Sequence, residues 1–325
     1  MPQPRRPGRW LLTTAVVAAV GMFVVNAVGF LDTETGSALG CGSDWPLCNG
    51  QVIPALTNLH VLIEFAHRAL VGGFALIAFG FVVAAYLRYR AWVEVRWLAA
   101  IGVGFTLIQS VLGALAVLFV NPPEVLALHL GFGLLAMVGV GLLAVFLFQM
   151  AREASGAGGL SLRRRGAPDV LRRWLWAGWG GLYVLLYWGS LVAFVGAGPA
   201  CPGWPLCGGW QWGTVGTLAA LNLIHRLLAL AYFVLTVAIW RQVGRVAPDR
   251  PDLGRAAGWQ VLLTAFQGWT GANLVWNHLA TGPDLLHVTV VMGLFTLASY
   301  QLLQAFPYRQ PETAWRRAAE PRPTS

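Results

Sequence analysis

The sequence predicts an all-α integral membrane protein, with eight transmembrane helices arranged as two tandem, parallel-repeat four-helix bundles. Three observations support this: the composition, the apolar runs and an internal repeat. Of 325 residues, 57% are apolar and 11% are charged, and the mean hydropathy is +0.63. Soluble globular proteins carry roughly 25% charged residues. So few charges cannot cover a soluble body of this size, whereas a lipid-facing surface needs no such cover.

Eight apolar runs have the length of about 20 residues that a helix needs to cross the hydrocarbon. They run approximately over Trp10 to Leu31, Asn58 to Leu87, Val95 to Val120, Glu124 to Met150, Trp174 to Gly196, Thr214 to Trp240, Ala256 to Asn277 and Asp284 to Phe306. The first run is longer than the apolar region of a cleaved signal peptide, so we expect it to be retained as a span.

All 22 basic residues are Arg, and the net charge is +9. Twenty of them flank the spans on one side only: Arg5, Arg6, Arg9, Arg88, Arg90, Arg96, Arg152, Arg163, Arg164, Arg165, Arg172, Arg173, Arg241, Arg245, Arg250, Arg255, Arg309, Arg316, Arg317 and Arg322. The positive-inside rule therefore predicts a multi-pass plasma-membrane protein with both termini in the cytoplasm. This distribution marks topology and predicts no nucleic-acid partner. Arg68 and Arg226 instead lie inside spans, where a charge is costly and indicates function.

A constant offset of 158 residues relates the two halves. It joins His67 to His225, Gln109 to Gln267, Gly113 to Gly271 and His129 to His287. The string Trp-Pro-Leu-Cys ends at Cys48 and again at Cys207, 159 residues later. We therefore expect a first bundle over residues 1–150, a cytoplasmic linker over 151–173, a second bundle over 174–308 and a cytoplasmic tail over 309–325.

Four of the six histidines come early in the spans that run inward from the outside, so they share one depth. They are His67, His129, His225 and His287. Bundle cores often hold cofactors, and imidazole is a common axial ligand of haem iron. We therefore expect one haem between two histidines in each half. Polar contacts between helices are the alternative. His60 and His278 lie at outer ends without equivalents, and no site is predicted for them.

A di-iron site is a weaker alternative. Glu64 and His67 have the Glu-x-x-His spacing of di-iron bundles, and His60 lies on the same helical face. However, Asn222 replaces the glutamate in the second half, and Glu124 is the other glutamate near the outer face. The available carboxylates are too few for such a site.

The halves differ beside the histidines. Glu64 precedes His67 by about one helical turn, so the first half has an intramembrane acid suited to proton transfer, while the second has Asn222. The alternative is that Glu64 only pairs with Arg68 at i+4. Because Arg226 has no acid at i−4, we expect a haem propionate as its anionic partner, and Arg68 is a second candidate for that role.

All four cysteines lie in predicted outer loops, as Cys41 with Cys48 and Cys201 with Cys207. Disulfides persist outside the cytoplasm, and these spacings differ from the usual zinc pattern. We expect two disulfides in extracytoplasmic loops. A redox-active first pair remains the alternative.

Together these residues resemble the haem A synthase family, whose members convert haem O to haem A for cytochrome oxidase. The resemblance covers nearly the whole chain. It rests on Thr35-Gly36-Ser37, the Cys41 to Cys48 loop, Glu64-Phe65-Ala66-His67-Arg68, His129, the Cys201 to Cys207 loop, His225-Arg226 and His287. One departure is Asp32-Thr33-Glu34, where the family often has a basic residue.

The resemblance implies that haem O binds between His67 and His129 as the substrate, and that His225 and His287 hold haem b. Glu64 matches the family's catalytic carboxylate. The implied reaction hydroxylates a haem methyl group twice, and water loss then leaves the formyl group of haem A. The expected partners are haem O, an enzyme that supplies it, an unidentified redox partner and membrane lipid, with a homo-oligomer left open.

Two other functions fit parts of this pattern. A di-haem b electron carrier would explain the four histidines but not the acid in one half alone. A parallel-repeat transporter would explain the repeat and the charges within spans but not the depth-matched histidine pairs.

Overall fold

The structure is a computed structural model that describes residues 6–55, 58–164, 166–208 and 216–308. Over these ranges the chain forms eight α-helices and one short 3-10 helix, η1. Their bounds are α1 (Arg9–Glu34), α2 (Leu59–Tyr89), α3 (Val93–Leu118), α4 (Pro123–Ala154), η1 (Ser161–Arg163), α5 (Asp169–Phe194), α6 (Thr217–Val246), α7 (Pro251–Trp276) and α8 (Thr281–Ala305). The prediction of an all-helical membrane protein is confirmed.

Seven of these helices are long and apolar enough to span a membrane, and α7 falls short in hydropathy rather than in length. It carries Gln260, Gln267 and Asn273 along its interior. The Gln260 side chain is buried and donates to the Tyr232 hydroxyl of α6 over 3.0 Å. A buried amide is tolerated in a bundle when it is hydrogen-bonded, so these polar residues fit a helix that packs against α6 and α8.

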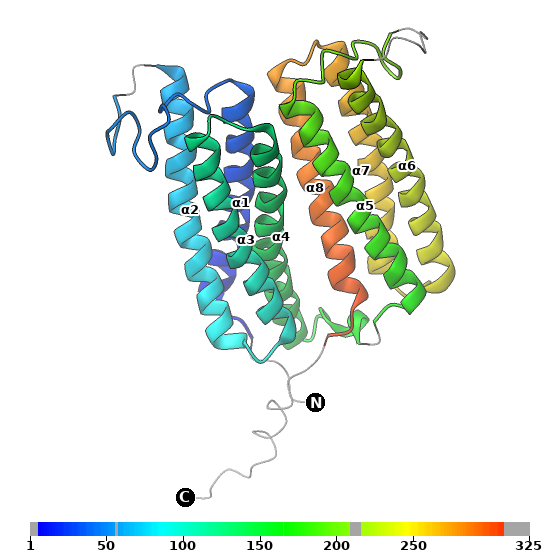
Figure 1. Ribbon diagram of the computed structural model, residues 1–325. Helices are drawn as coiled ribbons and strands as arrows, with labels where there is room; N and C mark the ends of the chain where they lie inside the picture. The colour runs from blue at the N-terminus through cyan, green and yellow to red at the C-terminus, as the bar shows by residue number, and fades with distance from the viewer. Residues whose placement is uncertain (1–5, 56–57, 165, 209–215, 309–325) are drawn as a thin grey trace, which may run out of the picture.

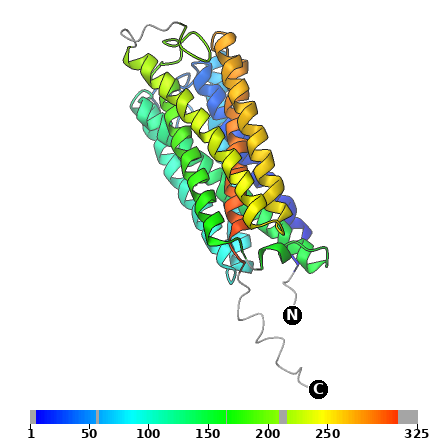
Figure 2. The same cartoon turned by 90° about the vertical axis from the view of Figure 1, so that its right-hand side faces the viewer.

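Helices α1 to α4 pack against one another, and so do α5 to α8 (Figure 1). The first group meets the second through contacts of α4 with α5 and α8 and of α1 with α8. Within the most apolar 18-residue stretch of α4, 72% of the residues are buried, because this helix has protein on most sides. The eight helices run nearly parallel to one long axis when seen from the side (Figure 2).

The two ends of the molecule differ. The start of α1 and the end of α8 lie at one end, which we call the terminal end, and the two cysteine loops lie at the opposite, disulfide end (Figure 1). An even number of helices places both chain ends on the same side. Arg5, Arg165 and the predicted tail over 309–325, with Arg309, Arg316, Arg317 and Arg322, lie outside the described residues.

Matching turns close the last helical hairpin of each half at the disulfide end. Val120 and Asn121, between α3 and α4, have φ of 59° and 56°, and His278 and Leu279, between α7 and α8, have φ of 52° and 60°. Residues of this kind adopt positive φ uncommonly. The backbone therefore takes the same unusual conformation at positions 158 residues apart, and His278 serves in this turn.

The linker between the halves is anchored by a buried arginine. Arg163 is 1% exposed. Its guanidinium pairs with Glu94 of α3 at 3.2 Å and donates to the carbonyl oxygen of Phe306 after α8, also at 3.2 Å. Arg250 is likewise buried and pairs with Asp252 at 2.8 Å. Arg163 and Arg250 thus stabilise packing in addition to marking topology.

Candidate functional site

The four conserved-offset histidines lie on the even-numbered helices. His67 is on α2 and His129 on α4, while His225 is on α6 and His287 on α8. His67 and His129 are close enough to interact electrostatically, and the same holds for His225 and His287. Each bundle thus brings two imidazoles together, nearer its disulfide end.

Each imidazole packs against a glycine on the preceding helix. A Cβ added to Gly29 of α1 would lie 2.6 Å from Cε1 of His67, and one added to Gly113 of α3 would lie 3.0 Å from Cε1 of His129. In the second bundle the corresponding distances are 2.8 Å from Gly189 to His225 and 3.3 Å from Gly271 to His287. The glycines provide the room in which the rings are seated.

Hydrogen bonds orient one histidine of each pair. Nδ1 of His129 lies 2.8 Å from the backbone oxygen of Gln109. Because a carbonyl only accepts, Nδ1 carries the proton, and the lone pair of Nε2 is available to a metal. In the second bundle, Nδ1 of His287 lies 2.8 Å from Oγ1 of Thr270, and the Gln267 amide nitrogen is 3.0 Å from the ring.

The other histidine of each pair has an unsatisfied ring nitrogen. Nδ1 of His67 and Nδ1 of His225 are buried with no hydrogen-bond partner among the described residues. Buried polar atoms are seldom left without partners, and exceptions often mark a site for an absent group. Two facing imidazoles, one of them fixed through Nδ1, form a donor set that fits the axial ligands of haem.

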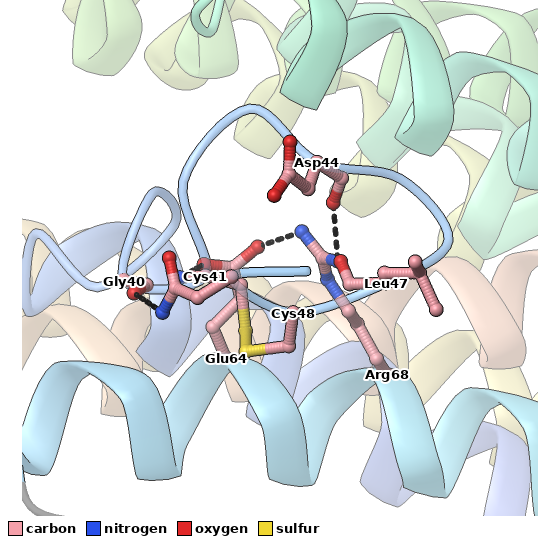
Figure 3. Close-up of polar contacts among 8 residues, drawn as sticks. Gly40, Cys41, Asp44, Leu47, Cys48, Glu64 and Arg68 are labelled. Atoms are coloured by element: carbon pink, nitrogen blue, oxygen red, sulfur yellow. Dashed lines mark hydrogen bonds and ion pairs between the residues drawn. A yellow bond between two sulfur atoms is a disulfide. The ribbon is translucent and has the colours of Figure 1, made fainter. Parts of the chain in front are cut away.

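Glu64 and Arg68 attach the first cysteine loop to α2. Glu64 is 2% exposed, and its Oε2 accepts from the backbone N–H of Cys41 at 2.6 Å while its Oε1 pairs with Arg68. Arg68 also donates to the carbonyl oxygens of Asp44 at 2.9 Å and Leu47 at 2.6 Å. Figure 3 shows both side chains reaching from α2 to the loop beside the disulfide. The i+4 pairing of Glu64 with Arg68 is therefore present.

The second bundle repeats this attachment without a carboxylate. Asn222 accepts from Nε of Arg226 at 2.9 Å and donates to the carbonyl oxygen of Ala197 at 3.2 Å. Arg226 donates further to the carbonyl oxygens of Cys201 at 2.9 Å and Pro205 at 3.0 Å. Backbone carbonyls thus receive most of the hydrogen bonds of a guanidinium for which the sequence suggests only an anionic partner. Its propionate role stays a prediction.

Both expected disulfides are present. Cys41 bonds to Cys48, and Cys201 bonds to Cys207. Cys41, Cys48 and Cys201 are buried, so the first disulfide packs beneath its loop, next to Glu64. This confirms the pairing of the cysteines within their own loops.

The Thr35-Gly36-Ser37 motif holds His60. The Ser37 hydroxyl is buried and lies 2.7 Å from the Thr35 hydroxyl and 2.9 Å from Nδ1 of His60. Gly36 has φ of 66°, which places the chain in a left-handed turn after α1. This motif therefore connects the end of α1 to the start of α2.

Sequence reasoning missed two features of the site. Asp32 of α1 is 5% exposed, lies near Glu64 and Arg68, and has an Oδ1 atom without a hydrogen-bond partner in the described part of the chain. Gly29 and Gly189 were also missed, because they are 160 rather than 158 residues apart. A search that allowed a small shift between helices would have found them.

This fold and these sites define a class: helical membrane proteins of two packed four-helix groups, each with a facing histidine pair beneath a disulfide loop. A family model described as "Cytochrome oxidase assembly protein" (COX15-CtaA) matches residues 9–299. The chain belongs to this family.

Relatives match over nearly their whole lengths. The protein named "Heme A synthase" of Geobacillus thermodenitrificans is 32% identical over 325 residues, which cover 97% of each chain. The "Heme A synthase" of Symbiobacterium thermophilum is 33% identical over 279 residues, covering 85% of this chain and 89% of the relative. The one from Exiguobacterium sibiricum is 29% identical over 295 residues, covering 91% and 95%.

Proposed function

We propose that this protein is a haem A synthase, which oxidises a methyl group of haem O to a formyl group. The observation that carries the proposal is the pair of facing histidines in each bundle, with every ring seated on a glycine. The similarity to proteins named "Heme A synthase" over 97% of the chain supports it.

We assign the two haems to different bundles. Haem O is the substrate between His67 and His129 in the domain over 1–150, and haem b is the resident cofactor between His225 and His287 in the domain over 174–308. The support is the one chemical difference between otherwise similar surroundings: Glu64 stands beside the first pair, and Asn222 takes its place in the second.

The reaction converts the methyl carbon by two successive two-electron hydroxylations to a geminal diol, which loses water to give the formyl group. Haem iron supplies the redox chemistry. His67 and His129 hold the substrate macrocycle in place. Glu64 lies one helical turn before His67, and we assign it the movement of protons during the oxidations. Arg68 keeps the carboxylate in position and remains a candidate partner for a propionate, as does Arg226.

We place the disulfide end outside the cytoplasm, with both termini and the linker inside. The arginine distribution supports this orientation, and so do disulfides in both loops, because disulfides persist in oxidising compartments. The protein would then lie in the plasma membrane, with both haem sites in the outer half of the bilayer. The haem O supplier, the redox partner and the oligomeric state remain predictions of the resemblance.

Pigment extraction tests the proposal. The full-length protein is expressed with and without a haem O supply, purified, and its haems are extracted and separated. Haem A in the first preparation supports the enzyme. Unmodified haem alone would instead favour the di-haem electron carrier, and a colourless protein would favour the transporter.

A further inference from the structure

An apolar groove lies between α2 and α3, in the half of the first bundle nearer the terminal end. Its volume is about 360 Å³, and its lining includes Val82 and Val83 of α2 and Ala100 and Val103 of α3. Its polar residues, Tyr86 and Arg96, stand closer to the terminal ends of these helices.

The corresponding place in the second bundle is filled. At the offset of 158 residues, Trp240 of α6 replaces Val82, and Gly258 of α7 replaces Ala100. A Cβ on Gly258 would lie 3.6 Å from Nε1 of Trp240, so the indole reaches across from α6 to α7. A large ring therefore takes up the space that two small side chains leave free in the first bundle.

We propose that the groove binds the isoprenoid chain of haem O. This inference rests on the proposed function and specifies how the first bundle recognises its substrate. Haem O carries a hydroxyethylfarnesyl group where haem b has a small vinyl group, so a haem O site requires an apolar channel that a haem b site does not. The bundle with the groove is the one with Glu64, and the bundle with Trp240 is the one assigned to haem b.

The route from the histidines to the groove follows α2. Val82 lies 15 residues after His67, a distance of about 22 Å at 1.5 Å per residue. An extended farnesyl chain that starts at the edge of the porphyrin covers a distance of this order. Between the two points, α2 has Gly72 and Gly73 and α3 has Gly104, where an added Cβ would meet nothing within 4 Å. These glycines leave the path along both helices open.

Transferring the tryptophan between the bundles tests the proposal. The double variant Val82→Trp/Ala100→Gly reproduces the second bundle in the first. Because Val82 is buried, Val83→Trp, at a position 36% exposed, provides a variant that fills the groove from its open side. Haem O and haem b are titrated separately into the purified full-length protein, and the haem b retained by the second bundle reports correct folding.

We expect both variants to weaken haem O binding about tenfold or more, since apolar burial of the chain is lost. The affinity of the first bundle for haem b should change little. In the reciprocal variant Trp240→Val, the second bundle should accept haem O alongside haem b.

Three results would overturn the groove assignment: unchanged haem O affinity in both variants, an equal loss of haem O and haem b affinity, or a phospholipid that the variants displace while haem O binding stays unchanged. The last would identify a lipid as the occupant, with Arg96 beside its phosphate. If the wild-type protein forms haem A while one of these results holds, the proposed function stands and only the groove assignment falls.

Discussion

The carboxylate of Glu64 accepts a hydrogen bond from the backbone N–H of Cys41 at 2.6 Å. The residue assigned to proton transfer is therefore in direct contact with the first disulfide loop. In the second bundle the equivalent Asn222 bonds to the backbone of Ala197 and to Arg226. The contact with the loop end is retained while the charge is lost, so the two halves separate the structural part of this position from its chemistry.

Replacing Glu64 with asparagine should therefore preserve the fold and stop the reaction. Asparagine keeps a hydrogen-bonding group, as in the second bundle, but cannot take up a proton. General acid–base groups contribute roughly 10² to 10⁴ in rate, so haem A formation should fall by that factor in Glu64→Asn and in Glu64→Ala, with bound haem retained. Extracted haem A per mole of protein measures the effect, and Asn222→Ala is the matched control. Normal haem A formation in Glu64→Asn would remove Glu64 from the mechanism.

Adding a methyl group beneath a histidine should empty one site at a time. Gly29→Ala would bring a carbon to 2.6 Å from the His67 ring, and Gly189→Ala one to 2.8 Å from the His225 ring. Atoms cannot approach this closely, so each ring must move away from its position for ligation. We expect Gly29→Ala to lose haem from the first bundle and Gly189→Ala to lose haem b from the second. Haem type and count per chain measure this.

Gly72→Ala is the control for both glycine variants, because its new Cβ would meet no atom within 4 Å. It should keep both haems. If Gly29→Ala and Gly189→Ala also kept both haems with unchanged absorption spectra, the seating of the rings on these glycines would have no part in haem binding.

Replacing Arg226 with lysine should loosen the second cysteine loop. The guanidinium donates to Asn222 and to the loop carbonyls of Cys201, Gly203 and Pro205. A lysine ammonium lacks the planar, multi-directional donor geometry that these contacts require. Amide hydrogen exchange over residues 198–208 should become about tenfold faster, since the loss of one or two hydrogen bonds costs roughly 1–3 kcal/mol. Unchanged exchange would argue against Arg226 as the attachment of this loop.

Removing the buried arginine of the linker should destabilise the whole chain. Arg163→Ala takes the positive charge away from the buried Glu94 and also removes the bond to the Phe306 carbonyl. Breaking a buried ion pair costs about 3–5 kcal/mol. The neighbouring pair of Arg164 with Glu153 spans 3.8 Å with a half-exposed arginine, so Arg164→Ala should cost less than about 1 kcal/mol. Denaturant unfolding in detergent compares the two variants, and equal costs would contradict the structural role of Arg163.

The parts of the fold that depend on local sequence were predictable. Apolar runs identify helices wherever a span faces lipid, and arginine placement gives a common side to alternate loops. The histidine pairs followed from the offset of 158 residues, because imidazoles at matched depth in parallel repeats must lie at the same level. The cysteine pairing followed from the short loops.

The parts that depend on how segments fold back on one another were not predictable. The contact of Glu64 with Cys41 requires the loop to return over α2, and the burial of Arg163 requires the linker to enter the junction between the bundles. Gly29 and Gly189 gain their importance only from the rings packed against them. The polar side chains of α7 lower its hydropathy because some of them bond within the bundle, as Gln260 does to Tyr232.

The account claims that one chain holds two haems of different kinds, a substrate in the first bundle and a cofactor in the second. The most direct measurement is the type and number of haems per chain in the wild-type protein and in His225→Ala, both purified from cells that make haem O. We predict haem b together with haem O or haem A in the wild type, and a selective loss of haem b in His225→Ala. An unchanged haem b content in that variant, or a wild-type protein that contains haem b alone, would contradict the account.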